Sequence, residues 1–476
     1  MTPVMISPNP EIAGRAAATG PAHRQFDWPL AYPAEELLRA YIKTFLGQNA
    51  FARNLALRMQ AETGTDFFEW VDHLVLPASA EATLRETGFS RDDVEGPPGG
   101  RVLHHPRATL PRVILGEAEI PVVIALRPEF VADFLAQNNL EAEIDGAPFS
   151  RFRRATVNVE NDTVVEIVER RAYRGFQVAP LPPGRLAAIL EAKELWHTRR
   201  RFWEDDAQGF ARAKNLLARS LELVGQGETC QIFFEAERAY WESRNRAARI
   251  QKFRQDRLGL GWGNHDHHTF RSSREHFVDL TEFLLALGFE KRERFYAGAE
   301  AGWGAQVSEQ PLAGITVFAD VDLLPDETLT DFSSIRLPAA PKLNTVGLWT
   351  GLHGESFLGA GMHHLEARFD YQLLRDQLEG EGINTMKPFS DFAFLKQAFT
   401  EGERWPVARS RAQKLLAAGL ITTEQFEKFV REGALGSHLE NLQRHGGFKG
   451  FNQKSVSAVI AATDPRREHF AHPAGD

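Results

Sequence analysis

The sequence contains one cysteine, Cys230, among its 476 residues. A single thiol excludes a disulfide framework, a cysteine zinc site and an iron–sulfur cluster built by this chain. Any transition metal bound here would therefore depend on histidine, carboxylate and water.

Long apolar runs are also missing. No stretch of about eighteen apolar residues occurs, and the first residues lack the apolar segment of a signal peptide. The sequence therefore predicts a soluble, cytoplasmic protein. We expect no membrane as partner.

Positive charge is in deficit. The chain has 55 Lys and Arg against 64 Asp and Glu, a formal net charge of -9. This balance argues against nucleic acid as the main partner and favours a small molecule. The oligomeric state stays open, a homo-oligomer included.

The composition is that of a globular protein, with 43% hydrophobic and 25% charged residues. Residues 1–25, rich in Pro, Ala and Gly, are predicted to be a disordered leader. Two copies of one domain are predicted at 26–183 and 257–476, joined by a helical connection at 184–256.

The two copies emerge when the chain is compared with itself. LLRAYIKTFLGQNAFARNLAL resembles FFEAERAYWESRNRAARIQKF, and a strand and a helix follow each segment, which places His267 over His73. The motif PFS-x-F recurs at 148–152 and 388–392, with a larger offset, so the second copy carries an insertion. Repeats of this length indicate duplicated domains rather than a solenoid.

Each copy contains two units in which a strand and a helix precede further strands. Such βαβββ modules, when paired, form curved sheets around a central metal pocket. The predicted fold class is α+β: tandem duplicated domains of paired βαβββ modules that form a metal-binding cup, with flanking helices and, in the second copy, a helical insertion.

The segment GWGNHDHHTFRSSREHFVDLTEFLLALGF, from Gly261 to Phe289, is the predicted active-site unit. Alternation along a strand places His267, Thr269 and Arg271 on one face. An amphipathic helix follows and ends at Gly288. We expect the chemistry to lie on the strand.

The second copy offers polar residues that the first lacks. His363 and His364 stand where the first copy has Val122 and Val123. After PFS-x-F the second copy has FTEGER, with Glu401 and Glu403; the first has VVEIVERR, with Glu166 and Glu169. Only the second copy is therefore predicted to be catalytic.

Two histidines and one carboxylate from separate strands, with open positions beside them, are typical of non-haem Fe(II) oxygenases. We predict this triad at His267, His364 and Glu401, with Glu403 as the alternative carboxylate. The open positions suit a bidentate 2-oxo acid and dioxygen. Arg271 is predicted to pair with the distal carboxylate of the substrate.

Structural roles remain alternatives for the histidines. His265, His267 and His268 could form a hydrogen-bonded turn cluster. His363 is expected to be structural, because strand alternation points it away from His364.

Two further alternatives concern Arg271 and the first copy. Arg271 could pair with an acid such as Asp266. His73 has no companion histidine at Val123 and is expected to be structural, while a separate site around it stays open.

At these residues the sequence resembles the 2-oxoadipate dioxygenase/decarboxylase family, non-haem iron enzymes of lysine catabolism in the vicinal-oxygen-chelate superfamily. The resemblance covers residues of about 230 to 465. It lies in the NRAAR-like helix, H-x-x-x-R from His267 to Arg271, ALGFEKRERF, HHLEAR, F-x-E-x-E from Phe399 to Glu403, and KSVSAVIA.

The resemblance implies that Fe(II) is the cofactor, with His267, His364 and Glu401 as its ligands. It also implies that Arg271 holds the substrate carboxylate, and that Val456 and Ser457 contact the substrate. The implied reaction is oxidative decarboxylation of a 2-oxo acid and hydroxylation of the shortened acid, which converts 2-oxoadipate to 2-hydroxyglutarate.

Two other functions fit the same residues. One is a non-oxidative, metal-dependent isomerase, epimerase or lyase of the same superfamily, with Glu401 or Glu403 as general base. The other is a ligand-binding protein without catalysis, whose histidines are structural.

Overall fold

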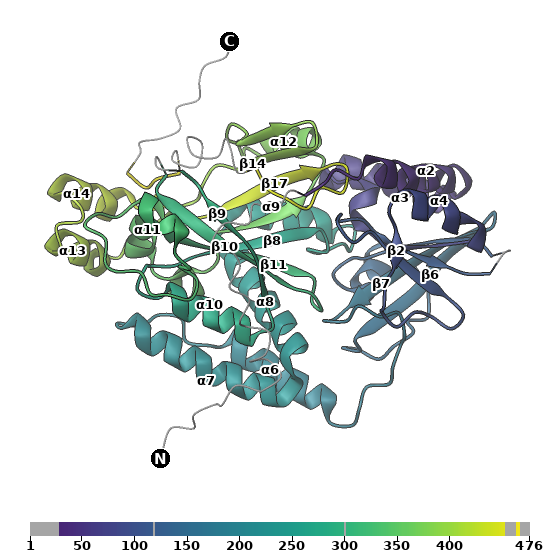
Figure 1. The fold of residues 1–476 in the computed structure, drawn as a ribbon, viewed down its shortest axis with the longest axis horizontal. Coiled ribbons are helices and arrows are strands. Elements are labelled where there is room, and N and C mark those ends of the chain that lie inside the picture. Colours follow the sequence, from purple (N-terminus) through teal and green to yellow (C-terminus); the bar gives the residue numbers. More distant parts are fainter. Residues whose placement is uncertain (1–27, 118–119, 299–300, 453–462, 467–476) are drawn as a thin grey trace, which may run out of the picture.

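The computed structural model describes residues 28–117, 120–298, 301–452 and 463–466. The predicted leader at 1–25, and the predicted substrate contacts Val456 and Ser457, lie outside the described residues. Figure 1 shows two halves, each built on a curved sheet with helices against it.

The first sheet has seven strands in the order β2-β3-β4-β1-β5-β7-β6. The central strands β1 and β5 are antiparallel, and each has a parallel neighbour, β4 or β7. The strands are β1 (Val71–Leu76), β2 (Ser90–Arg91), β3 (Arg101–His104), β4 (Arg112–Leu115), β5 (Val122–Leu126), β6 (Phe152–Glu160) and β7 (Thr163–Arg170).

The second sheet has eight strands in the order β13-β14-β17-β12-β8-β11-β10-β9. Its central pair, β8 and β12, is again antiparallel, with the parallel neighbours β11 and β17. The strands are β8 (His265–Arg271), β9 (Glu290–Tyr296), β10 (Trp303–Gln310), β11 (Ile315–Asp322), β12 (His364–Arg368), β13 (Ser390–Phe392), β14 (Leu395–Phe399) and β17 (His438–Arg444). A separate small sheet pairs β15 (Arg404–Trp405) with β16 (Ala434–Leu435).

Each sheet consists of two βαβββ modules that meet at the antiparallel pair. One helix follows the first strand of each module: α4 (Glu81–Glu86), α5 (Val131–Gln137), α10 (Phe277–Ala286) and α12 (Tyr371–Gly380). The structure therefore confirms the predicted fold class of tandem, paired modules. In the second module of the first copy, an isolated bridge from Asp145 to Arg154 takes the place of a full strand.

The inserted segments of the second copy are helical. They comprise α11 (Thr345–His353) between the modules, and α13 (Arg409–Ala417) and α14 (Thr423–Glu432) between β14 and β17. Of these helices only α11 precedes the second PFS-x-F motif and contributes to its larger offset; α13 and α14 follow the motif and lie at the far left of Figure 1.

Helices also precede each copy. They are α2 (Tyr32–Gln48) and α3 (Ala50–Arg58) before the first, and α6 (Arg185–His197), α7 (Asp206–Val224), α8 (Gln226–Ser243) and α9 (Arg246–Asp256) before the second. Short helical turns complete the described chain: η1 (Met59–Thr63), η2 (Phe67–Trp70), η3 (Ala78–Ala80), η4 (Pro325–Leu329) and η5 (Ser356–Ala360). The domain boundaries stay a proposal, with α6 to α9 occupying the proposed connection.

Strand alternation divides the second sheet into two faces. His268 and Phe270 of β8 pack against Phe234 of α8, on the convex face. His267 and Thr269 line a cavity on the opposite, concave face. No helix among the described residues is long and apolar enough to cross a membrane.

A buried asparagine caps the last α-helix before each copy. Asn49 Oδ1 accepts a hydrogen bond from the Ala52 amide, and Asn245 Oδ1 accepts one from the Ala248 amide, both at 2.8 Å. Asn245 also donates through Nδ2 to the Ser437 hydroxyl at 2.8 Å. Asn245 therefore ties a helix of the connection to the segment that leads into β17.

Replacing Asn245 with alanine removes this cap and leaves the Ser437 hydroxyl without that partner. We expect the free energy of unfolding to fall by about 2 to 3 kcal/mol, more than for a cap alone. The control is Asp205→Ala, which removes the exposed cap of α7 at Ala207 and should cost about 1 kcal/mol or less. Urea unfolding followed by circular dichroism measures both variants. Equal losses of unfolding free energy would contradict a stabilising role of the hydrogen bond from Asn245 to Ser437.

Candidate metal centre

Register brings polar residues together on the concave face of the second sheet. Across the central strands, Glu366 of β12 lies opposite His267 of β8, and His364 lies opposite Thr269. On the other side of β12, Glu366 lies beside Glu440 of β17. Cross-strand neighbours share a face, so these side chains converge although they are far apart in sequence.

His267, His364 and Glu440 form the group that best suits a metal ion. One ligand atom from each lies within 4.8 Å of the others, and all three residues are buried. The Glu440 Oε2 atom lies 2.9 Å from His364 Nε2 and 3.9 Å from His267 Nε2. Two imidazoles and one carboxylate on three strands match the ligand set of a facial triad.

A second grouping, Asp266, His267 and Glu366, is less suited to a metal. It has one histidine, and arginines already engage Asp266: Arg444 Nη2 lies at 3.2 Å and Arg368 Nε at 3.3 Å. Neither Asp266 nor Glu366 lines the cavity, whereas His267, His364 and Glu440 all do.

Glu366 and Gln397 orient the ligands. The Glu366 carboxylate contacts Nδ1 of His267, which leaves Nε2 directed to Glu440. Gln397 donates through Nε2 to Glu366 at 2.9 Å and to Glu440 at 3.2 Å. Partners of this kind fix the tautomer and direction of metal-binding histidines.

The electrostatics of the group favour a bound cation. Burial raises the pKa of Glu440 to about 8. Hydrogen bonds with Glu366 and with Gln397 lower this pKa, but by less than burial raises it. Burial, and then repulsion from His267, holds the pKa of His364 well below its usual range. A neutral imidazole can bind a metal, and a divalent cation would offset the cost of burying the charged form of Glu440.

The carboxylate in this group is Glu440, whereas the sequence predicted Glu401 or Glu403. Glu401 is exposed, and its Oε1 accepts a hydrogen bond from Asn384 Nδ2 at 2.9 Å. Glu403 contacts the backbone amide of Arg246. Both follow the end of β14 rather than a strand beside His364, so neither belongs to this group, and the predicted carboxylate stays a prediction.

A usable signal for Glu440 was present in the sequence. The tripeptide HLE occurs at His364–Glu366 and again at His438–Glu440, and the two copies of it pair in register as β12 and β17. Because α13 and α14 separate β14 from β17, the last strand of the module is far from PFS-x-F.

The other predicted histidines have partners outside the triad. His265 Nδ1 hydrogen-bonds with the Trp262 carbonyl at 2.8 Å, and His363 Nδ1 does so with the Gly436 carbonyl at 2.9 Å. His268 packs edge-on against Phe234 on the convex face. These three side chains therefore have structural surroundings, in line with the alternatives weighed from the sequence.

Arg271 lies on the concave face with Asp320 of β11, its register partner. Its Nε lies 3.9 Å from Asp320 Oδ2, and its Nη1 makes no hydrogen bond to a described residue although it is buried. Asp320 lines the cavity, whereas Arg271 does not. The alternative partner Asp266 is instead engaged by Arg368 and Arg444.

The cavity beside the triad has a volume of about 50 Å³ and a largely aromatic wall. Thr269, Asp320, Gln397 and Asn452 add polar groups; the aromatic residues are Phe295, Trp303, Phe318, Phe389, Phe399 and Phe451. Such a wall excludes water and orients a small ligand through few polar contacts.

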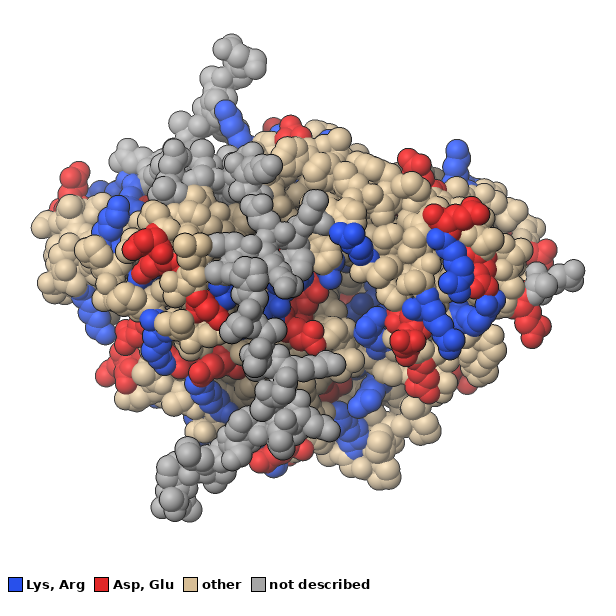
Figure 2. All heavy atoms as spheres, viewed as in Figure 1, with Lys and Arg blue, Asp and Glu red and all other residues tan. Residues whose placement is uncertain are grey.

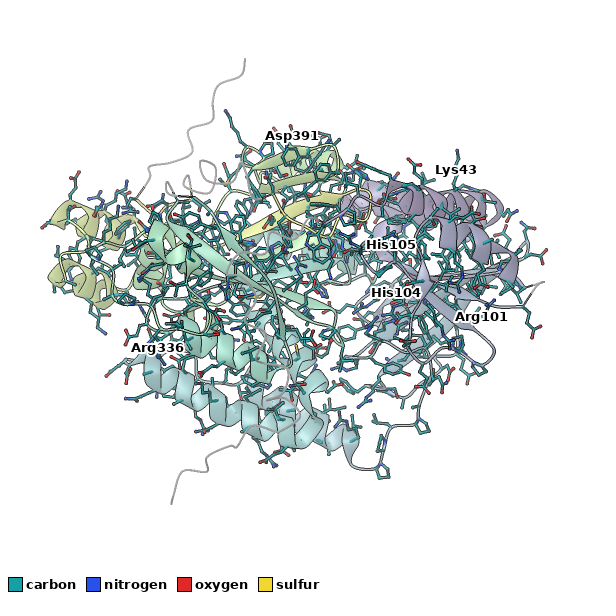
Figure 3. The ribbon with its side chains drawn as sticks, viewed as in Figure 1. Lys43, Arg101, His104, His105, Arg336 and Asp391 are labelled. Carbon is teal, nitrogen blue, oxygen red and sulfur yellow. The ribbon has the colours of Figure 1, made fainter. Side chains whose placement is uncertain are left out.

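The equivalent face of the first copy lacks a second histidine. His73 Nδ1 lies 2.7 Å from Asp72 Oδ2, and its ring packs against Phe176. Register places Ala125 opposite His73, where the second sheet has Glu366 opposite His267. His104 and His105, near the end of β3 in Figure 3, belong to neither candidate metal group of the described residues.

Comparisons with known proteins do not assign the chain to a family. No family model matches it, and no curated protein matches it. Among similar solved structures, a mutant of 4-hydroxymandelate synthase from Streptomyces coelicolor is 15% identical, with 84% of this chain and 99% of that chain covered and a TM-score of 0.28. Methylmalonyl-CoA epimerase from Mycobacterium tuberculosis is 11% identical, with 38% of this chain and 88% of that chain covered and a TM-score of 0.23. A xylose isomerase-like TIM barrel/4-hydroxyphenylpyruvate dioxygenase fusion protein is 9% identical, with 87% of this chain and 56% of that chain covered and a TM-score of 0.23. These TM-scores are too low to support an argument. The description of the fold and of the candidate site therefore rests on the strand order and the geometry given above.

A matched pair of variants distinguishes the two candidate carboxylates. We expect Glu440→Gln to lower the affinity for Fe(II) or Co(II) by about 100-fold or more, because a charged ligand is lost. Glu401→Gln should leave it unchanged. Anaerobic calorimetric titration measures both, and a loss confined to Glu401→Gln would restore the carboxylate predicted from the sequence.

Removing the charge of Glu366 tests the orientation of His267. We expect Glu366→Gln to lower metal affinity by about 10- to 100-fold while the protein stays folded. Gln397→Ala should have a smaller effect in the same direction. Unchanged metal affinity in Glu366→Gln would show that the Nδ1 contact does not orient the ligand.

Proposed function

We propose that this protein is an Fe(II)-dependent dioxygenase that oxidatively decarboxylates a 2-oxo acid and hydroxylates the product within the same molecule. The observation that carries the proposal is the buried group of His267, His364 and Glu440 beside an aromatic cavity. In this proposal His267 and His364 keep the metal-binding roles expected from the sequence, and Glu440 replaces Glu401.

The ligand set fits ferrous iron, since two imidazoles and one carboxylate leave positions open for other ligands. Iron held in this way supplies a site where a 2-oxo acid chelates and dioxygen is activated. The protein's part is to hold three ligands rigidly on adjacent strands. Glu366 fixes His267 through its Nδ1 side.

The aromatic wall keeps water from the reaction. Phe318 packs against His267 with a ring separation of 4.4 Å, and Phe399 packs against His364 at 5.1 Å. Excluding water protects a reactive site from side reactions and strengthens the electrostatic contacts inside it.

For the substrate we propose a dicarboxylate, with 2-oxoadipate and its product 2-hydroxyglutarate as the leading pair. Arg271 supports this proposal, because it is buried on the same face as His267 and its Nη1 lacks a described partner. A substrate carboxylate would compete with Asp320 for the guanidinium. Because the cavity holds about 50 Å³, side chains of its wall must shift to admit a six-carbon acid.

The first test measures oxygen uptake and carbon dioxide release by the Fe(II)-loaded protein with C4 to C7 2-oxo acids and phenylpyruvate. We expect equal uptake and release with one dicarboxylate. Faster turnover of phenylpyruvate would overturn the dicarboxylate. Turnover without oxygen would favour the non-oxidative isomerase, epimerase or lyase, and no metal binding would leave the ligand-binding alternative.

Substituting Arg271 tests its role in substrate binding. Arg271→Gln should raise KM for the preferred dicarboxylate by about 30-fold or more, because a charge-assisted hydrogen bond is lost. A monocarboxylic 2-oxo acid should show little change in KM. Arg271→Lys keeps the charge and provides a folded comparison; equal losses for both acids would contradict a contact with the distal carboxylate.

A further inference from the structure

We infer that the cavity between the two copies, away from the metal centre, binds a small oxyanion of the phosphate class. The cavity has a volume of about 240 Å³ and is lined by both copies. Its basic wall consists of Arg112, Arg127, Arg170, Arg174, Arg368 and Arg444. In Figure 2, side chains of Lys and Arg lie near the junction of the two halves, among acidic ones.

The duplication places equivalent arginines in this cavity. Arg127 follows Ala125 by two positions, as Arg368 follows Glu366, and register aligns Ala125 with Glu366. Both arginines therefore leave the same corner of their sheets and face one cavity.

A second pair of arginines follows the same rule. Arg170 ends β7 and Arg444 ends β17, each on the strand parallel to the central one. Each pairs with the acid at the second position of a central strand. In the first copy, Arg170 Nε lies 2.7 Å from Asp72 of β1; in the second, Arg444 Nη2 lies 3.2 Å from Asp266 of β8. The duplicated sheets thus direct two matching sets of guanidinium groups at one space.

The arginines outnumber the acids that neutralise them. The acids are Asp72, Asp92, Asp266 and Glu69, which pair with these arginines, and Glu35, which lines the cavity and pairs with Arg39: six arginines against five carboxylates leave one positive charge uncompensated. Burial raises the pKa of Glu69 to about 7, although Arg368 opposes this, so its negative charge is incomplete near neutral pH. Arg170 is buried and the other five arginines are partly buried, so an anion that shares the space would lower the cost of this excess positive charge.

Arg127 identifies where the anion would bind. Its guanidinium makes no hydrogen bond or ion pair to a described residue, although it lines the cavity. Burial lowers the pKa of Arg127, and Asp72 only partly opposes this because Arg170 and Arg368 also lower it. An arginine among other arginines offers parallel N–H donors that match the oxygens of a phosphate.

The size and polarity of the cavity limit the ligand. About 240 Å³ admits a phosphate, a diphosphate or a small phosphate monoester, and its wall is mainly polar. Phe68, Trp70 and Leu312 provide limited apolar contact, which suits a compact anion better than an extended apolar acid. This site goes beyond the proposed oxidation and does not depend on it.

Calorimetric titration of the full chain with inorganic phosphate, diphosphate, glycerol phosphate and citrate tests the proposal. We expect saturable binding of at least one phosphate compound, weakened by about 10-fold or more in Arg127→Gln. The matched control is Arg101→Gln on the same copy, an exposed arginine on β3 labelled in Figure 3, which should bind as the unsubstituted protein does.

The outcomes separate this site from the metal centre and from a purely structural cluster. Metal affinity should be unchanged in Arg127→Gln, which also verifies folding; Arg127→Lys is the second variant if Arg127→Gln does not fold. Tighter binding of citrate than of any phosphate compound would overturn the phosphate class. No binding, or equal binding by Arg127→Gln, would overturn the site.

Discussion

The antiparallel pairing of β8 with β12 is the constraint on which the candidate metal centre depends. This pair joins two βαβββ modules and sets the register that faces His267 with Glu366 and Thr269 with His364. A slip of one residue would turn every one of these side chains to the convex face. The aromatic contacts of His268 and Phe270 with α8 oppose such a slip, because they would then face the cavity.

The first copy shows what the same frame does without that polar set. Its central pair carries Val123 and Ala125 at the positions of His364 and Glu366, and there Phe176 packs against His73 and against Phe152. The frame of the sheet is the same, but these two positions are apolar. The Asp–Arg pair at its corner is kept, and this corner faces the second copy rather than the cup.

Local patterns predicted the parts of the site that lie within one strand. Alternation along β8 predicted that His267, Thr269 and Arg271 share a face, and comparison of the copies predicted the histidine at 364. The paired βαβββ fold followed from the same comparison. These predictions rest on periodicity and on short offsets, which sequence alone carries.

The carboxylate could not be located in the same way, because its strand is brought in by a parallel pairing across an insertion. Glu440 reaches the site through β17, after two helices that interrupt the module. Asp320 meets Arg271 by a similar long-range pairing of β11 with β8. Parallel neighbours need long connections, so the residues they contribute are separated in sequence from the motif they complete.

Buried charge links the two candidate sites. On the concave face of the second sheet, Glu366 and Glu440 lie side by side. Burial raises the pKa of both carboxyls, and the charge of Glu440 raises that of Glu366 further. Between the copies the imbalance has the opposite sign, with more guanidinium groups than carboxylates. Asp266 stands at the boundary, next to His267 in the chain and paired with Arg368 and Arg444. A cation in the cup would offset the carboxylates there, and an anion at the junction would offset the arginines, because isolated charge is costly in both places. The duplicated sheets supply residues of both candidate sites.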